Sequence, residues 1–155
     1  MQVSTMTIRK AREEDIAAIV AILAADDIGG HGDTTDASAR ADYLEAFRTL
    51  QQTPRENLYV AECAGEIVGT FQTLLTTTLT GRGGTSMVVE AVQTRPDMRG
   101  RGIGGKMIEF CLEEARRLGL RQVQLTSNAA RTDAHRFYER LGFARSHFGF
   151  KYKLK

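Results

Sequence analysis

The sequence predicts a single α/β domain over residues 1–155, in which an antiparallel meander of strands leads into a β-α-β unit. Two β-rich runs flank Ala64-Gly65-Glu66, which is typical of a hairpin. A glycine-rich turn joins a β-branched run ending at Thr94 to a long amphipathic helix, and another strand follows that helix. Because hairpins pair strands antiparallel and a strand–helix–strand crossover pairs them parallel, we expect a mixed central sheet.

The first part of the chain is expected to supply one strand and two helices. Residues 6–10 are a strand candidate, and two apolar faces at helical spacing follow, the second ended by Pro54. The residues on these faces are Ile16, Ile19, Val20 and Leu23, and then Tyr43, Leu44, Phe47 and Leu50. Between the helices, residues 26–36 form a polar, glycine-rich loop. Its aspartates favour a cationic partner such as an amine if the loop borders a site, and a mobile connection explains them equally well.

The second part of the chain is expected to build the meander and the crossover. The predicted strands are 58–63, 67–75, 87–94 and 123–126, and the predicted helices are 103–118 and 133–141. Gly142 ends the last helix. In the tail, four apolar residues alternate with glycine and lysines, which predicts a half-buried strand. These residues are Phe148, Phe150, Tyr152 and Leu154.

Composition and charge argue against several classes of protein. The net charge of +2 is too small to indicate nucleic-acid binding. No apolar run reaches the roughly 18 residues of a membrane span, and the N-terminus lacks the profile of a signal peptide. Cys63 and Cys111 are isolated and the histidines are scattered, so neither a disulfide framework nor a metal site is expected. We therefore expect a cytoplasmic protein that binds no metal, nucleic acid or membrane.

Residues 99–106, with the sequence Arg-Gly-Arg-Gly-Ile-Gly-Gly-Lys, predict a binding site for a phosphate or pyrophosphate. Glycines allow successive backbone N–H groups to point into one concavity. The helix that begins here adds unpaired N–H groups and the positive end of its dipole. Both features favour an anion.

Three known loop patterns overlap in this stretch, and the surrounding residues distinguish among them. The loop of nucleotide hydrolases needs Ser or Thr after Lys106 to bind magnesium, and the chain has Met107 there. A dinucleotide-binding fold needs a carboxylate at the end of the next strand, and residues 122–128 contain none. The third pattern, Arg99-x-x-Gly102-x-Gly104, is the acyl-coenzyme-A loop of N-acetyltransferases.

Together with residues 128–143, which end in Phe-Tyr-x-x-x-Gly-Phe, this loop resembles the GNAT superfamily of acetyl-CoA-dependent N-acetyltransferases. The resemblance covers residues 87–150. It implies a GNAT-like mixed sheet, splayed to admit acetyl-CoA and flanked by about four helices. The last third of the chain is similar to small-molecule acyltransferases, including those acting on aminoalkylphosphonates.

The resemblance also implies a cofactor site. The pantetheine arm would lie like an added strand between the two strands of the β-α-β unit, bonded by the backbone of Val92 and Thr94. The Val92 N–H would polarise the acetyl carbonyl. Asn128 would bond the pantetheine amide, with a role in capping a turn as the alternative. The pyrophosphate would be held by the loop residues Arg99, Gly100, Arg101, Gly102, Ile103, Gly104 and Gly105.

Two residues are candidates for proton transfer. Tyr138 stands where the family places an acid beside the thioester sulfur, and a packed aromatic is the alternative role. Glu90, on the strand leading to the splay, would take the amine proton through water if it faces the cleft, and would otherwise be a solvated or ion-paired residue. His31, His135 and His147 are weaker candidates for the base.

The sequence thus predicts an enzyme that moves the acetyl group of acetyl-CoA to a primary amine of a small molecule. A non-catalytic acyl-CoA-binding or sensor domain and an acetyltransferase of protein or peptide amines remain as alternatives. A homodimer is also expected from the resemblance, with the final strand as a candidate interface.

Overall fold

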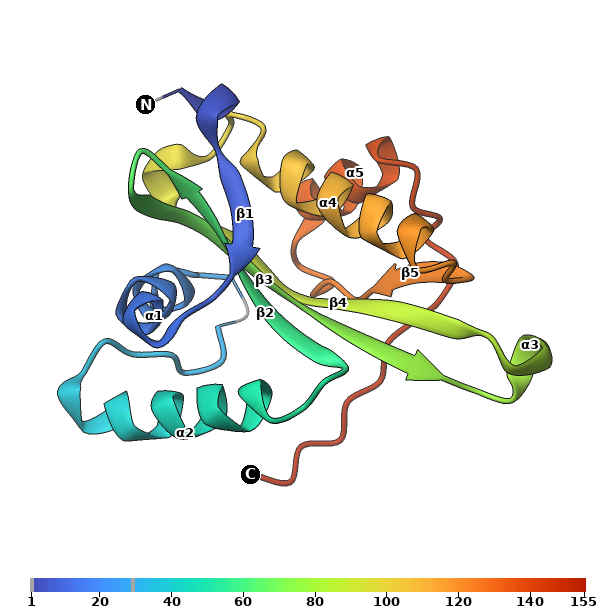
Figure 1. The fold of residues 1–155 in the computed structure, drawn as a ribbon, viewed down its shortest axis with the longest axis horizontal. Helices are drawn as coiled ribbons and strands as arrows, with labels where there is room; N and C mark the ends of the chain where they lie inside the picture. Colours follow the sequence, from blue (N-terminus) through green and yellow to red (C-terminus); the bar gives the residue numbers. More distant parts are fainter. Residues whose placement is uncertain (1, 29) are drawn as a thin grey trace. The chain divides into compact units, whose positions relative to one another are not determined.

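The computed structural model describes residues 2–28 and 30–155, so Gly29 of the polar loop lies outside the described residues. The chain forms two compact units (Figure 1). The first ends at Leu125 and holds the sheet, and the second is Thr126–Lys155. A single domain over residues 1–155 therefore stays a prediction.

Within the described residues, five strands form one mixed sheet in the order β1-β2-β3-β4-β5. The first three pairings are antiparallel, and β4 pairs parallel with β5. This confirms the predicted meander and crossover. The strands are β1 (Thr7–Lys10), β2 (Glu56–Cys63), β3 (Glu66–Thr77), β4 (Thr85–Thr94) and β5 (Gln122–Leu125).

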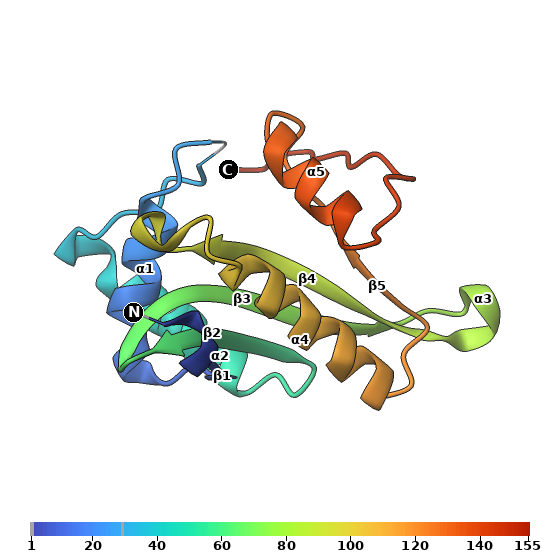
Figure 2. The ribbon, with the colours of Figure 1, turned by 90° about the horizontal axis from the view of Figure 1, so that it is seen from above.

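Helices cover both faces of this sheet. On one face, α1 (Ile16–Ala24) and α2 (Arg40–Gln51) bury their apolar residues, and Ile19 and Phe47 pack with Val60 of β2. On the other face, α4 (Ile103–Arg117) lies along β3 and β4 (Figure 2). Burial of these apolar surfaces is the main stabilisation of the unit.

The close approach of α4 to the sheet depends on Gly69. A Cβ built at this position would lie 2.8 Å from Met107 Sδ and 3.3 Å from Ile103 Cγ2. Both contacts are shorter than van der Waals packing allows. Gly69 therefore lets the first turns of α4 lie against β3.

A half-buried ion pair joins β1 to the turn before α1. Asp15, only 5% exposed, accepts hydrogen bonds from the Arg9 guanidinium at 2.7 and 3.0 Å. Arg9 Nε also donates to Glu62 at 3.0 Å. The hydrogen bonds from Arg9 lower the pKa of Asp15.

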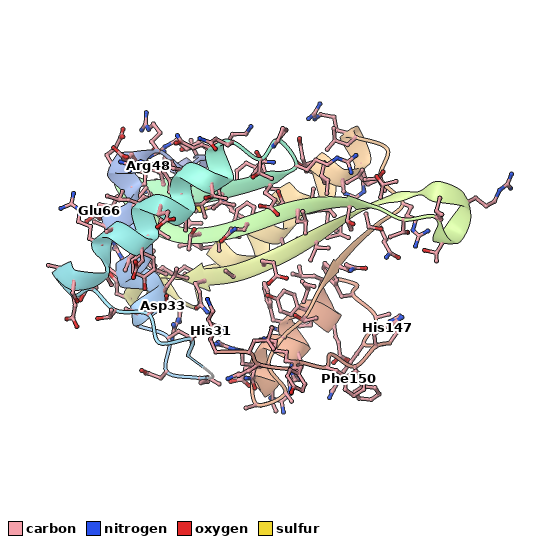
Figure 3. The ribbon with its side chains drawn as sticks, turned by 90° about the horizontal axis from the view of Figure 1, so that it is seen from below. His31, Asp33, Arg48, Glu66, His147 and Phe150 are labelled. Atoms are coloured by element: carbon pink, nitrogen blue, oxygen red, sulfur yellow. The ribbon has the colours of Figure 1, made fainter. Side chains whose placement is uncertain are left out.

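The connection between β3 and β4 is a tight turn, labelled α3 (Thr80–Gly83), in which Gly81 and Arg82 have left-handed φ of 61° and 67°. The structure departs from the sequence expectation in the tail. In the second unit α5 (Thr132–Arg140) is present, whereas residues 143–155 contain no helix or strand, so the predicted tail strand is wrong. The four apolar side chains of the tail are 86–95% exposed, because no strand of the described structure pairs with it. Figure 3 labels one of them, Phe150.

Within the described residues, no helix has both the length and the apolar character needed to cross a membrane.

Candidate active site

The glycine-rich loop opens α4 as the sequence predicts. Gly100 and Gly102 have φ of +75° and +83°, in the left-handed region that favours glycine. Gly102 is the N-cap residue, and the first helical bond runs from the Lys106 N–H to the Gly102 carbonyl at 3.1 Å. The preceding N–H groups of the first turn therefore have no helical acceptor. A Cβ at Gly102 or Gly105 would meet no atom within 4 Å, so the space in front of these groups is open.

Two arginines flank this candidate anion site. Arg99 and Arg101 are exposed, and neither forms a salt bridge with any residue in the described part of the chain. Ile103 is 1% exposed and anchors the first turn in the core, while Gly104 lies in the same turn. The loop therefore combines backbone donors with two available positive charges, which suits a pyrophosphate.

One edge of β4 is open beyond its pairing with β5. The parallel ladder joins Ser86–Val89 of β4 to Gln122–Leu125, and β5 ends there. β4 continues to Thr94, paired with β3 on its other side. No strand in residues 2–28 and 30–155 pairs with the β5-facing edge from Glu90 onward. β5 therefore ends where the sequence resemblance predicts that the two strands separate.

A β-bulge changes the direction of β4 at this point. Gln72 of β3 pairs with Glu90, whereas Thr70 pairs with Gln93, so β4 carries an extra residue. The bulge includes Ala91, whose φ is +52°. Such a conformation is strained for alanine, and strain of this kind concentrates at functional sites.

Glu90 lies on the sheet face that α1 and α2 cover. Directly opposed residues of an antiparallel pair share a face, so Glu90 shares its face with Gln72. Gln72 and Ala91 line a cavity whose other walls include Ile19 of α1 and Phe47 of α2. Glu90 is exposed, whereas the preceding Val89 is 2% exposed. Its carboxylate therefore reaches solvent beside this cavity.

Val92 lies in the bulge beside Ala91, Thr94 follows the bulge, and both Val92 and Thr94 are half-buried. Thr94 is opposed to Gly69, whose Cβ direction points at Met107 of α4, so its side chain lies on the α4 face. The backbone of both residues belongs to the stretch of β4 beyond the last β5 pair. This is the position expected for residues that bond an added strand.

The polar loop 26–36 is fixed at two points, which the sequence did not indicate. Gln93 Nε2 donates to Asp26 Oδ2 at 3.2 Å, linking the loop to β4. Tyr43 Oη of α2 donates to Asp33 Oδ1 at 2.8 Å. Burial, and then the bond to Asp33, raises the pKa of Tyr43. The loop is thus held against the same sheet face as Glu90.

The second unit carries the other predicted site residues. Tyr138 of α5 is half-buried and packs edge-on against Phe137 and Phe143, at ring-centroid distances of 5.1 and 5.9 Å. Asn128 Oδ1 accepts from the Ala130 N–H at 2.9 Å, which is an Asx turn that leaves the side-chain NH₂ as a donor. The structure therefore gives Asn128 the turn role while keeping a group that can bond a ligand.

The three histidines have separate surroundings. His135 Nε2 donates to the Asn128 carbonyl at 2.9 Å, and His147 Nδ1 shares a hydrogen bond with Ser146 Oγ at 2.7 Å. Figure 3 shows His31 on the loop between α1 and α2. Among the described residues, His, Cys, Asp and Glu side chains form no group of three that could hold a metal ion.

The first unit thus brings together the candidate anion site, the unpaired edge of β4 and Glu90. Comparison with known proteins gives the family of the chain. The profile of the acetyltransferase (GNAT) family matches residues 9–143. The chain belongs to this family. The GNAT-like mixed sheet and the enzyme class expected from the sequence are confirmed, and this GNAT protein is an N-acetyltransferase.

Individual relatives of this GNAT acetyltransferase agree with the assignment. It is 38% identical over 108 residues to the aminoalkylphosphonate N-acetyltransferase of Salmonella typhimurium, covering 70% of each chain. It is 36% identical over 105 residues to the mycothiol acetyltransferase of Thermobispora bispora, covering 66% of this chain and 36% of that one. A crystal structure described as a transcriptional regulator from Bacillus halodurans C-125 matches with a TM-score of 0.92 at 36% identity, covering 96% of this chain and 99% of the other.

Proposed function

We propose that this enzyme transfers the acetyl group of acetyl-CoA to a primary amine of a small molecule, by direct attack within a ternary complex. The observation that carries the proposal is the placement of an anion site at the start of α4 and of an open β4 edge in the same compact unit. The first suits a pyrophosphate and the second suits the amide-bearing arm of coenzyme A. The named relatives that acetylate small molecules support the same class of acceptor.

Residues of the first unit would hold the donor. The backbone N–H groups of residues 100–105 would bind the pyrophosphate, with Arg99 and Arg101 adding charge. The backbone of Val92 and Thr94 would bond the pantetheine arm. The Val92 N–H would donate to the acetyl oxygen, where negative charge develops as the amine attacks the carbonyl carbon.

Glu90 would accept the proton that the amine loses. A primary alkylamine has a pKa near 10.4 and is mostly protonated at pH 7, so it must lose a proton before it attacks. The carboxylate of Glu90 is exposed on the face that α1 and α2 cover, where a water molecule can relay this proton. The variant Glu90→Gln keeps the shape and removes the acceptor of the proton. We expect it to lower kcat by about 100-fold, with an unchanged Kd for coenzyme A.

Tyr138 would give a proton to the sulfur as the carbon–sulfur bond breaks. Phenol and thiol have ordinary pKa values near 10 and 8.5, close enough for a proton to pass from one to the other. The rings of Phe137 and Phe143 fix the orientation of the tyrosine within the second unit. The NH₂ group of Asn128 would donate to a carbonyl of the pantetheine arm.

Two further properties belong to the same proposal. The free, buried thiols of Cys63 and Cys111 fit the reducing cytoplasm as the location of the reaction. The exposed apolar side chains of the tail favour a homodimer that covers them.

A binding and turnover experiment tests the function. Acetyl-CoA and coenzyme A should each raise the melting temperature, whereas ATP and NAD should not. Release of coenzyme A should depend on an added amine. No thermal shift with coenzyme A would contradict the proposal at its first step.

A further inference from the structure

A small cavity lies between the sheet and the layer of α1 and α2, next to Glu90. Its volume is about 90 Å³. Phe47 and Leu50 of α2 form part of its wall, and Gln72 and Ala91 close it on the sheet side. Gln72 is the cross-strand partner of Glu90, and Ala91 follows Glu90 in the chain. Two neighbours of Glu90 therefore line the cavity, and Glu90 itself lies next to its lining.

The lining of this cavity is uncharged and almost entirely apolar. The Tyr43 hydroxyl at its edge already donates to Asp33 at 2.8 Å. The Thr70 hydroxyl donates to the Tyr59 carbonyl at 2.9 Å. The side chain of Gln72 has no hydrogen-bond partner within the part of the chain that the structure describes, so its amide is the polar group available to a ligand.

We infer, on the basis of the acetyl-transfer function proposed above, that the acceptor is a short primary alkylamine whose apolar group fills this cavity. A volume of 90 Å³ matches about three or four heavy atoms, since one water occupies roughly 30 Å³ in the liquid. The nitrogen lies at the Gln72–Glu90 end, where the amide oxygen accepts a hydrogen bond and the carboxylate attracts the ammonium form. Apolar packing in the cavity thus selects the length of the acceptor's alkyl group.

This acceptor differs from an aminoalkylphosphonate. A phosphonate needs cationic partners, and none of the residues lining this cavity is cationic. A larger hollow of about 530 Å³, near the turn between β2 and β3, is lined by Arg9, Arg12 and Arg95. Carboxylates already engage all three arginines, Arg9 through Asp15, Arg12 through Glu14 and Arg95 through Asp97. Neither space offers a phosphonate a free arginine cluster.

The test is a series of amines at saturating acetyl-CoA. Ethylamine, propylamine, butylamine, hexylamine and 2-aminoethylphosphonate are compared by kcat/KM. We expect about a fourfold increase for each added methylene up to butylamine, because each buries one more apolar group, and no gain beyond it. Equal values along the series, or a higher value for 2-aminoethylphosphonate than for butylamine, would overturn the inference.

Two variants of α2 change the volume of the cavity. Ala46 lines it and is exposed on its outer side, so Ala46→Leu should fill it and raise the KM for butylamine at least tenfold. Ala41→Leu, on the same helix and outside the lining, is the matched control. Leu50→Ala should enlarge the cavity and move the optimum from butylamine toward hexylamine. The assignment would be refuted if Ala46→Leu and Ala41→Leu changed the KM for butylamine equally and Leu50→Ala left butylamine as the best substrate.

Calorimetry separates this inference from the proposed function. Butylamine is titrated into the protein loaded with coenzyme A, so that binding is measured without turnover. If butylamine binds and Ala46→Leu weakens that binding, the cavity assignment stands. It then stands even if no amine causes release of coenzyme A, a result that would contradict the transferase proposal. If butylamine does not bind, the cavity assignment fails whatever the turnover with other amines.

Discussion

Replacing Gly102 by aspartate tests the anion site directly. Gly102 has φ of +83°, and a Cβ there would meet no atom within 4 Å, so the substitution adds backbone strain without a clash. Left-handed backbone costs an ordinary L residue roughly 1–2 kcal/mol, and Asp and Asn tolerate it better than most. We therefore expect a loss of about 1 kcal/mol in the free energy of unfolding, or about 2–4 °C in Tm.

The effect of Gly102→Asp on coenzyme A binding should be far larger than its effect on stability. A new unit charge about 4 Å from a phosphate charge costs about 4 kcal/mol at an effective dielectric constant of about 20. Salt screens part of this repulsion. Since about 1.4 kcal/mol is tenfold in affinity, we expect Kd for coenzyme A to rise at least about 100-fold.

Gly102→Asn is the matched control for this charge. Asparagine has the same size and a similar tolerance for the left-handed region, and it carries no charge. Calorimetry of both variants with coenzyme A, together with thermal melting, separates repulsion from strain. If the two variants show the same Kd, a pyrophosphate does not bind at this loop and the reasoning is refuted.

Four further outcomes are expected. Tyr138→Phe should lower kcat about 100-fold and leave the Kd for coenzyme A unchanged; equal losses in both would contradict an acid role. Arg9 lowers the pKa of Asp15 below the ordinary value of a carboxyl group, which is about 4. Ionised Asp15 therefore stabilises the fold above about pH 4, and this contribution is lost as the pH falls through the lowered pKa. Asp15→Asn should thus cost about 3 kcal/mol at pH 7, and progressively less below pH 4, in urea titrations; a pH-independent difference would count against the pair. Burial raises the pKa of Cys111 to about 12, so a disulfide reagent at pH 8 should label its thiol only after denaturation, and rapid labelling of the native protein would disprove its burial. Light scattering should give twice the chain mass of 17.1 kDa, and a monomer would exclude the homodimer.

Sequence patterns predicted the sheet and the glycine-rich loop that opens α4 because both depend on local features. Strand alternation and the apolar spacing of α4 identify the elements, and the glycines of residues 99–106 identify a backbone that must turn sharply. The left-handed Gly102 and the open first turn of α4 follow from these residue types.

The features that surround Glu90 could not be read from the sequence. The bulge places a positive φ at Ala91, which is an alanine and gives no sign of it. The bond between Asp26 and Gln93 joins residues 67 positions apart. Opposition of Thr70 to Gln93 depends on the register shift that the bulge creates. Each of these depends on tertiary pairing.

In the tail, the sequence pattern predicted a strand that the structure does not contain. Alternation of apolar and polar residues from Phe148 to Leu154 tells which side chains would share a face, but it does not supply the neighbouring strand that a ladder requires. The described chain offers no such partner, and the segment has no regular structure. A period of two in a sequence is therefore a necessary condition for a strand and not a sufficient one.

The open stretch of β4 has a consequence for the behaviour of the protein in concentrated solution. Residues 90–94 present backbone donors and acceptors along an edge that β5 no longer covers. An uncovered strand edge is a template on which another chain can pair, and proteins usually protect it. Bound coenzyme A would pair its amides with this edge and would thereby prevent edge-to-edge association between protein molecules. Stripping the bound donor during purification would then promote aggregation, and adding coenzyme A to the buffer would reverse it.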